Sequence, residues 1–384
     1  MLDSLTVFPF IIQPFLQFYL EGDFNDVFSI KYICQKYNIL LQKNIMYRKN
    51  ILVIVIVVGI IFTYLFHKEK FLIPVSRTQI LMDTVVTVKV YGNDRKYLET
   101  ILDEVFSKIK NLSELLNNYN KKSEIHKINA NAGIAPVKVS SVTIDFLLKS
   151  KALCLQTDGY LDITIGNTLN LWGFATDTPH VPEESDLKES LKYKGLNLIK
   201  IDKNNSTVFI LKKNVDIDVG AVAKGYIIDK VVEFLQSKKI VKAVVNAGGD
   251  IRFVGFKDKG KSWRVGIRNP LSNNESSVIK VINIGDWSVV TSGDYERYFI
   301  KNGKRYHHII NPFTGFPANK VHSVTVTAEN AFLADGIATA VFVMGDELFF
   351  NKYYNIFSKT KHFRVIIIKD NNTIVDSANF KALQ

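Results

Sequence analysis

A short segment, residues 216–229, constrains the fold of this chain more than any other part. It reads Asp-Ile-Asp-Val-Gly-Ala-Val-Ala-Lys-Gly-Tyr-Ile-Ile-Asp. The pattern predicts a buried strand over residues 215–219 that turns through glycines into a helix over residues 221–238, with Lys224 at the turn. Amides at a helix start carry partial positive charge and Lys224 adds a full charge, so the turn is a candidate anion site. The alternative is an ordinary turn with a solvated lysine, since no strict nucleotide-binding fingerprint is present.

Strand and helix signals alternate beyond residue 70, with no internal repeat and no linker that divides this part of the chain. Residues 84–91 have strand composition, residues 95–117 carry helical periodicity, and the polar, proline-bearing residues 175–186 indicate a surface loop. The same criteria predict helices over 145–156 and 331–344, and strands over 208–211, 243–246, 263–267, 288–291, 321–327 and 363–368, the last as a closing strand. The fold class is therefore α+β, or mixed α/β, with sheets flanked by helices.

Composition narrows the possible functions. A chain of 384 residues, 47% of them apolar, is long enough for one large catalytic unit with a sizeable core. The formal net charge of +12 suits a polyanionic ligand or an anionic membrane face. The basic residues are scattered and no basic helix or aromatic RNA-binding motif occurs, so nucleic acid is not an expected partner. Cys34 and Cys154 have the spacing of neither a disulfide framework nor a zinc or redox site, and Cys154 is expected in the core.

The N-terminal sixth differs from the rest of the chain. Residues 51–66 form an uninterrupted apolar run, preceded by Arg48 and Lys49 and closed by His-Lys-Glu-Lys at 67–70. The run is slightly short for a membrane-spanning helix, but long flanking side chains extend its reach. It ends in Tyr-Leu-Phe rather than in the small residues of a cleavage site, so residues 46–70 are expected to be an uncleaved membrane anchor.

Residues 1–45 fit neither an anchor nor a folded domain well. Their first twenty residues are rich in phenylalanine, but Pro9 and Pro14 interrupt them. Residues 46–50, Met-Tyr-Arg-Lys-Asn, make a better start for an anchor, so Met46 is a candidate for the true first residue. The competing interpretation is a short second membrane-associated segment.

Several further motifs occur in a fixed order. Besides 216–229, they are Asn-Tyr-Asn at 118–120, Thr-Asp-Gly-Tyr-Leu-Asp-Ile-Thr at 157–164, Leu-Trp-Gly-Phe at 171–174, Asn-Ala-Gly-Gly-Asp at 246–250, Thr-Ser-Gly-Asp-Tyr-Glu-Arg at 291–297, His-His-Ile-Ile-Asn-Pro at 307–312 and Ala-Asp-Gly-Ile-Ala-Thr at 334–339. In this order the set resembles the ApbE family of FAD:protein FMN transferases, from about Thr78 to about Gly345. The resemblance implies a single catalytic domain over residues 71–384.

Asp335 and Thr339 are the candidate metal ligands. They stand four residues apart in a predicted helix, so both side chains lie on one face. With a nearby backbone carbonyl they offer only oxygen, which favours Mg²⁺ over a soft metal. The resemblance places the metal motif on these two positions and implies a third ligand from a backbone carbonyl, that of Ala223 or alternatively Ala221.

The resemblance also implies which residues contact FAD as the substrate. Tyr119 and the stretch Tyr160, Leu161 and Asp162 match positions that hold the dinucleotide, and Met82 precedes an aspartate where the family typically has glycine. Lys224 and the amides around Gly225 would face the diphosphate, and Gly248 and Gly249 would allow close backbone approach. The flavin side would be lined by Thr291 and Ser292.

The implied reaction is transfer of FMN to a threonine hydroxyl of a partner protein, with release of AMP. A hydroxyl is a weak nucleophile at neutral pH, so a base is expected. The base is assigned to His308, which also counts as an FAD contact, because it matches the family's histidine and imidazole titrates in the useful range. His307 is expected to face outward, and Asp294 is the second candidate base. Lys224 is expected to stabilise charge on the phosphoryl oxygens.

Two other functions remain open from the sequence. One is an FAD pyrophosphatase, which gives FMN and AMP with water as the nucleophile, and the other is a non-catalytic, membrane-anchored FAD-binding protein. The resemblance points to a subunit of a membrane redox complex as the acceptor. The basic residues before the apolar run predict a single-pass protein of the inner membrane with its catalytic domain on the periplasmic side.

Overall fold

A computed structural model describes residues 54–59, 72–257, 260–274, 276–369 and 373–379. Residues 54–59 are helical, and the remainder of the predicted anchor and the whole of residues 1–45 lie outside the described residues. None of the helices in those ranges combines the length and the apolar composition that crossing a membrane requires. Residues 71–384 form one compact unit, and it is this unit that contains the fold and the candidate site.

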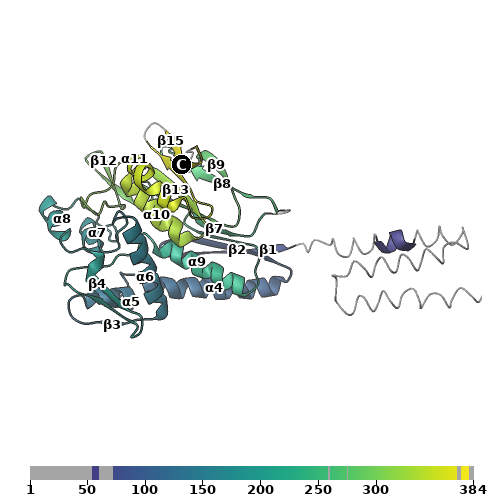
Figure 1. Cartoon of the computed structure of the whole chain (residues 1–384), viewed down its shortest axis with the longest axis horizontal. Helices are drawn as coiled ribbons and strands as arrows, with labels where there is room; N and C mark the ends of the chain where they lie inside the picture. Colours follow the sequence, from purple (N-terminus) through teal and green to yellow (C-terminus); the bar gives the residue numbers. More distant parts are fainter. Residues whose placement is uncertain (1–53, 60–71, 258–259, 275, 370–372, 380–384) are drawn as a thin grey trace, which may run out of the picture. The chain divides into compact units, whose positions relative to one another are not determined.

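The centre of the fold is an eight-stranded sheet in the order β1-β2-β6-β7-β10-β13-β14-β15 (Figure 1). Each neighbouring pair in it is antiparallel. The strands are β1 (Ile73–Leu81), β2 (Thr84–Gly92), β6 (Ala243–Ala247), β7 (Asp250–Val254), β10 (Ser288–Gly293), β13 (Ser323–Ala328), β14 (Arg364–Ile368) and β15 (Ile374–Asp376). The strand predicted over 363–368 is present, but it does not close the sheet, because β15 pairs with its outer edge.

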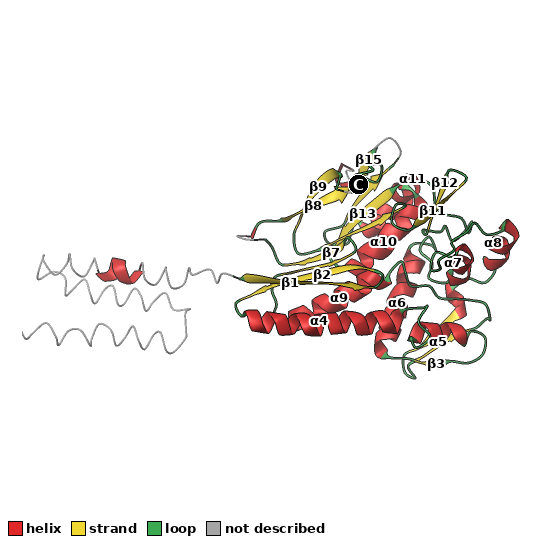
Figure 2. Cartoon of the chain, turned by 180° about the vertical axis from the view of Figure 1, so that it is seen from behind, coloured by secondary structure: helices red, strands yellow, loops and turns green. Residues whose placement is uncertain are grey.

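Alternation along the strands directs their apolar side chains to two different cores. Val290 and Val326 point to the main core, beneath the helices α4 (Arg95–Leu116), α9 (Ala223–Ser237) and α10 (Ala331–Met344). Their neighbours on the opposite face, such as Val289, pack against the hairpin of β8 (Trp263–Arg268) and β9 (Val278–Ile284). The period of two in these strands thus produces a sheet that is covered on both faces, in agreement with the mixed α/β class expected from the sequence (Figure 2).

Smaller elements complete the unit at one end of the large sheet. They are α5 (Glu124–Ala130), α6 (Ser141–Gln156), α7 (Gly166–Trp172), α8 (Glu184–Ser190), the 3₁₀ turn η1 (Leu196–Leu198) and the sheet of β3 (Val137–Lys138), β5 (Thr207–Ile210) and β4 (Ile199–Asp202). The hairpin of β11 (Tyr298–Lys301) and β12 (Lys304–His307) precedes β13, and α11 (Asp346–Leu348), η3 (Phe349–Tyr353), α12 (Tyr354–Phe357) and η5 (Ser377–Asn379) follow α10 and β15. The loop predicted over 175–186 extends only to Glu183, because α8 begins at Glu184.

The strand predicted over residues 215–219 is wrong. The segment is buried, but it forms only an isolated bridge between Asp216 and Ile165 instead of a ladder. A side chain takes the place of a neighbouring strand: Ile217 N donates to Asn129 Oδ1 and Asn129 Nδ2 donates to the Ile217 carbonyl, both at 2.9 Å. The backbone hydrogen bonds of the segment are therefore satisfied without a sheet, which pattern analysis does not detect.

Candidate active site

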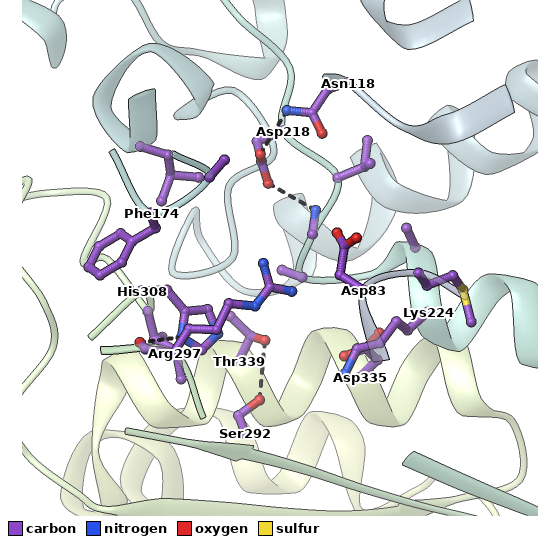
Figure 3. Close-up of a pocket in the computed structure, with 18 of the residues that line it drawn as sticks. Asp83, Asn118, Phe174, Asp218, Lys224, Ser292, Arg297, His308, Asp335 and Thr339 are labelled. Atoms are coloured by element: carbon purple, nitrogen blue, oxygen red, sulfur yellow. Dashed lines mark hydrogen bonds between the residues drawn. The ribbon is translucent and has the colours of Figure 1, made fainter. Parts of the chain in front are cut away.

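A pocket of about 460 Å³ opens where the loops at one edge of the large sheet meet α9 and α10 (Figure 3). Its lining comes from segments far apart in the chain, among them the β1–β2 turn, residues 116–119 at the end of α4, residues 160–162, residues 218–224 and the β10–β11 connection. The antiparallel topology brings these connections to one end of the sheet. The pocket is large enough for a small-molecule ligand.

Most of the residues singled out from the sequence line this one pocket. They are Met82, Tyr119, Tyr160, Leu161, Asp162, Ala221, Ala223, Lys224, Gly248, Thr291, Ser292, His308, Asp335 and Thr339. Gly225, Gly249 and Asp294 are not part of the lining. Because the residues that do line it are spread over more than 250 positions of sequence, their convergence is a property of the fold.

The start of α9 forms the charged wall of the pocket. Lys224 lies in the first turn of the helix, and its ammonium group is 2.6 Å from Asp250 Oδ2 at the start of β7. Burial opposes the charged form, but the carboxylates of Asp250 and Asp335 raise the pKa of Lys224 above its usual value. Lys224 is therefore a permanent positive charge beside a helix N-terminus, which is an arrangement that binds anions.

Gly225 has a different position from the one inferred from the sequence. It is buried inside α9, and its N–H donates to Asp335 Oδ2 at 2.9 Å instead of facing the pocket. A Cβ at this position would lie 2.4 Å from the Ala331 carbonyl oxygen, so glycine is required here for close packing of α9 on the start of α10. Gly248 does line the pocket: its φ of +63° and the proximity of Thr84 explain why a glycine turns the chain between β6 and β7.

Asp335 and Thr339 lie one turn apart on α10 and both reach the pocket. Asp335 is fully buried, and desolvation together with the neighbouring Asp250 raises its pKa to about 8. A carboxylate that is buried in this way lacks sufficient positive charge around it, and a bound cation would supply that charge. Thr339 Oγ1 lies 3.3 Å from Ser292 Oγ, so the donors here are all oxygen, which fits Mg²⁺.

The hydrogen bonds of α9 favour Ala221 over Ala223 as the third ligand. Ala223 is the first residue of α9, so its carbonyl belongs to the hydrogen-bond ladder of the helix. In a longer helix the Ala221 carbonyl would accept from the N–H of Gly225, but that N–H donates to Asp335. Since Ala221 lines the pocket, its carbonyl is the better candidate to bind a cation.

The two adjacent histidines have opposite positions. His307 is buried, contrary to the expectation that it faces outward: its Nε2 lies 2.6 Å from the Ala318 carbonyl oxygen and its ring packs edge-on against Phe342. His308 lines the pocket, and its Nδ1 lies 3.2 Å from the carbonyl oxygen of Arg297. Since a carbonyl only accepts, Nδ1 carries the proton and Nε2 of the neutral ring can accept one. Burial, and then the charge of Arg297, lower the pKa of His308 to about 3.

Asp294 is a structural residue in this arrangement. Its carboxylate is bound by His322 Nδ1 at 2.7 Å and by Arg305 at 3.2 Å, and it does not line the pocket. A general base has to lie within reach of the proton that it accepts, directly or through one water. The geometry therefore does not support Asp294 as an alternative base.

Asp218 is a residue of the pocket that the sequence analysis missed. It accepts hydrogen bonds from Gly220 N at 2.9 Å and Asn118 Nδ2 at 3.0 Å, and the Tyr119 hydroxyl lies at 3.5 Å. Desolvation raises its pKa. A half-buried carboxylate that lines a pocket is suited to bind N–H or O–H groups of a ligand. Asp218 lies within the motif 216–229, so the sequence did contain a signal for it. The strand predicted over 215–219, however, implied a buried core segment and not a pocket wall.

Aromatic and acidic residues at 160–162 also line the pocket. Tyr160 packs edge-on against Phe313 with ring centroids 4.9 Å apart, and Asp162 Oδ1 accepts from the amide and hydroxyl of Thr164 at 2.8 and 2.6 Å. At the pocket edge, Met82 and Asp83 both have φ of 56° in the two-residue turn between β1 and β2. The aspartate therefore occupies a left-handed position that glycine adopts more readily.

This fold and pocket define a mixed α/β protein in which a lysine at the start of α9 faces a carboxylate and a hydroxyl of α10 across one pocket. The ApbE family model matches residues 82–354, and the chain belongs to that family. A relative from Vibrio cholerae named FAD:protein FMN transferase is 36% identical over 260 residues, which is 66% of this chain and 75% of the relative. One of the same name from Klebsiella pneumoniae is 32% identical, over 71% of this chain and 83% of the relative.

Solved structures agree with this assignment. The ApbE protein from Thermotoga maritima superposes with a TM-score of 0.72 and 32% identity, over 79% of this chain and 96% of that structure. The flavin transferase ApbE from Vibrio cholerae gives a TM-score of 0.69 and 30% identity over the same shares. The resemblance seen in the sequence motifs and the expected fold class are both confirmed, and the family is one of transferases.

Proposed function

We propose that this protein transfers FMN from FAD to a threonine hydroxyl of an acceptor protein in a Mg²⁺-dependent reaction that releases AMP. The observation that carries the proposal is the convergence of Lys224, Asp335, Thr339 and His308 on one pocket, in a chain whose relatives are named FAD:protein FMN transferase. Together they offer an anion site, a cation site and a proton acceptor. These are the groups that a displacement at a diphosphate requires.

Lys224 and the start of α9 hold the diphosphate in this proposal. The fixed ammonium charge and the helix N-terminus favour the oxygens that gain negative charge as the bond between the two phosphates breaks. Asp335, Thr339 and the Ala221 carbonyl would hold Mg²⁺, which would neutralise part of the charge on the phosphoryl oxygens.

His308 receives the proton. The threonine Oγ attacks the phosphorus of the FMN half, the P–O bond to the AMP half breaks, and the hydroxyl proton passes to His308 Nε2. The hydrogen bond from Nδ1 to Arg297 fixes the tautomer that leaves Nε2 able to accept. The low pKa of His308 makes it a weak base, and the negative charge of a bound diphosphate would raise that pKa.

The remaining lining residues suit the nucleoside and flavin parts. Tyr119 and Tyr160 present aromatic surface, and Asp162 and Asp218 present carboxylates that can accept from a ribose hydroxyl or a base N–H. Met82, Leu161, Thr291 and Ser292 complete the wall. We assign these residues to FAD without dividing them further between its two halves.

The experiment is incubation of the purified protein with FAD and Mg²⁺, with and without an acceptor flavoprotein that has not received its FMN. AMP released only with the acceptor, together with a covalently flavinylated acceptor, supports the transferase. AMP released without an acceptor indicates an FAD pyrophosphatase, since the same cation and anion sites serve attack by water. No AMP under either condition indicates a non-catalytic FAD-binding protein.

We also propose where the reaction takes place. The apolar run at 51–66 and the basic residues before it support an inner-membrane anchor with the catalytic unit on the periplasmic side. An acceptor in a membrane redox complex would then lie on the same side of the membrane as the pocket.

A further inference from the structure

The pocket has an electrostatic imbalance for a site that takes a diphosphate. Its lining contains the acidic residues Asp83, Glu114, Asp162, Asp218, Glu296 and Asp335, against two basic residues, Lys224 and Arg297. Lys224 is already 2.6 Å from Asp250. Binding a polyanion beside so many carboxylates therefore requires positive charge beyond that of Lys224.

Arg297 is the basic side chain available for this role. It lies in the connection between β10 and β11, is exposed at the pocket and extends into its middle (Figure 3). Among the residues that the structure describes, no carboxylate forms an ion pair with its guanidinium. Its charge nevertheless reaches the site, since it acts on Asp218, Lys224 and His308.

The backbone of Arg297 is held independently of its side chain. Its carbonyl oxygen accepts from His308 N at 3.1 Å and lies 3.2 Å from His308 Nδ1. The residue is thus fixed beside the proposed base while the guanidinium remains open to the pocket. A planar guanidinium can donate two parallel hydrogen bonds to one phosphate group.

We propose that Arg297 is a second cationic contact of the substrate diphosphate, which it binds from the β10–β11 connection while Lys224 binds it from α9. The inference rests on the proposed function, because it takes FAD as the ligand. It adds a residue that binds the phosphates and that ties substrate binding to the position of His308.

The test compares two ligands on one variant. The equilibrium dissociation constants for FAD and for riboflavin, which has no phosphate, are measured with Mg²⁺ in the absence of an acceptor, and chromatography checks that FAD remains intact. Arg297→Gln should weaken FAD binding by about 10- to 100-fold, the effect of losing a hydrogen-bonded charge, and leave riboflavin binding within about twofold. Arg297→Lys keeps the charge but lacks the planar pair of N–H donors, so its FAD affinity should lie between those of wild type and Arg297→Gln.

Lys301→Gln is the matched control, because it removes an exposed positive charge from β11 outside the pocket lining. It should leave both constants unchanged. Equal weakening of FAD and riboflavin by Arg297→Gln, or no weakening of either, would overturn the proposal. If Arg297→Gln does not fold, FAD binding by Arg297→Lys at wild-type strength would overturn it as well. A protein that binds FAD with this dependence but transfers no FMN would refute the proposed function and leave the role of Arg297 intact.

Discussion

At the scale of single residues, the site combines groups whose charges depend on one another. Asp335 binds the Gly225 amide, lies near Asp250 and Lys224, and is fully buried. A carboxylate in these surroundings keeps its charge only if cations compensate it. The chain supplies Lys224 for this, and the proposed Mg²⁺, held by Ala221, Thr339 and Asp335, would supply the rest.

The metal assignment predicts that Asp335→Ala abolishes transfer. The substitution removes the only charged ligand of the proposed Mg²⁺ site, so the diphosphate charge is poorly compensated. AMP release and flavinylation of the acceptor are measured over a range of Mg²⁺ concentrations. Asp346→Ala, which removes an acidic residue near the other end of α10, is the control. Wild-type rates for Asp335→Ala at ordinary Mg²⁺ would contradict the assignment.

The base assignment predicts that His308→Ala lowers transfer by about 10²- to 10⁴-fold, the usual contribution of a general base, while FAD binding persists. Rate and FAD affinity are measured on the same preparation. His180→Ala, in the exposed loop before α8, should leave both unchanged. A loss of binding in proportion to the loss of rate would make His308 a substrate contact and place the base elsewhere.

At the scale of elements, the site depends on how the segment before α9 is fixed. Residues 215–222 run through the core without belonging to a sheet, and Asn129 from α5 binds both backbone groups of Ile217. This clamp positions Asp218 and the Ala221 carbonyl beside Lys224. A side chain 88 residues away thus sets the geometry of the candidate cation site.

Asn129→Ala should lower the free energy of unfolding by about 1–3 kcal/mol, because it leaves the N–H and carbonyl of Ile217 without their partner. FAD binding should weaken as well, since residues 218–224 line the pocket. Urea unfolding and FAD titration measure the two effects. Asn131→Ala is the control, because its side chain binds only the Lys127 carbonyl of its own helix. Equal destabilisation by both variants would show that the clamp has no special role.

Sequence patterns predicted the positions of helices and strands more reliably than the hydrogen-bond partners of each segment. The helix over 331–344 is a long apolar run and the strand over 84–91 alternates with a period of two residues, and both appear within one residue of the prediction. The segment 215–219 has strand composition, but both backbone groups of Ile217 bind the Asn129 side chain, a tertiary contact that composition does not encode. His307 and His308 cannot be told apart by residue type, since only the end of the β11–β12 hairpin decides which ring enters the pocket.

The position of the candidate site was also predictable only in part. The motifs indicated which residues belong together, and most of them line one pocket. Asp218 and Arg297 lay inside those motifs, but their roles depend on where their side chains point, which follows from the fold. Gly225 shows the reverse case, because a glycine expected to face a ligand is required for helix packing instead.

At the scale of the whole unit, an acidic residue joins the far edge of the large sheet to the hairpin on its outer face. Asp376 on β15 is buried and binds Arg364 on β14 through two hydrogen bonds of 2.9 and 2.6 Å, with Lys280 of β9 at 2.7 Å. Burial alone would raise its pKa, but these two cations hold the pKa of Asp376 well below its usual value. The ionised carboxylate therefore stabilises the folded state.

The low pKa of Asp376 fixes the sign of a pH effect. Its stabilisation is fully present above the pKa of the unfolded chain, about 3.9, and is lost as the pH falls toward the lower pKa of the folded state. Asp376→Asn should be less stable than wild type by about 1–3 kcal/mol at pH 7, with a difference that shrinks below about pH 4. Denaturant unfolding at several pH values measures it, with Asp177→Asn in an exposed loop as the control. A difference that is constant down to pH 3 would contradict the role of the charge.

The proposed orientation of the chain in a membrane rests on its basic residues. Lys43, Arg48 and Lys49 precede the apolar run of 51–66, and the positive-inside tendency would hold that end in the cytoplasm. His67, Lys68 and Lys70 follow the run and reduce the difference in positive charge between its two sides. The predicted orientation therefore depends on which flank of the run is the more basic.

Protease added to intact spheroplasts should therefore degrade the domain of residues 78–384, while a cytoplasmic marker protein stays intact. Replacing Arg48 and Lys49 by serine should reduce the degraded fraction, because it removes the charge bias that orients the apolar run. The same double substitution should leave transfer by the purified protein unchanged, since these residues lie outside the compact unit that contains the pocket. Protection of the wild-type domain until the membrane is lysed would show that it faces the cytoplasm, on the same side as its basic flank.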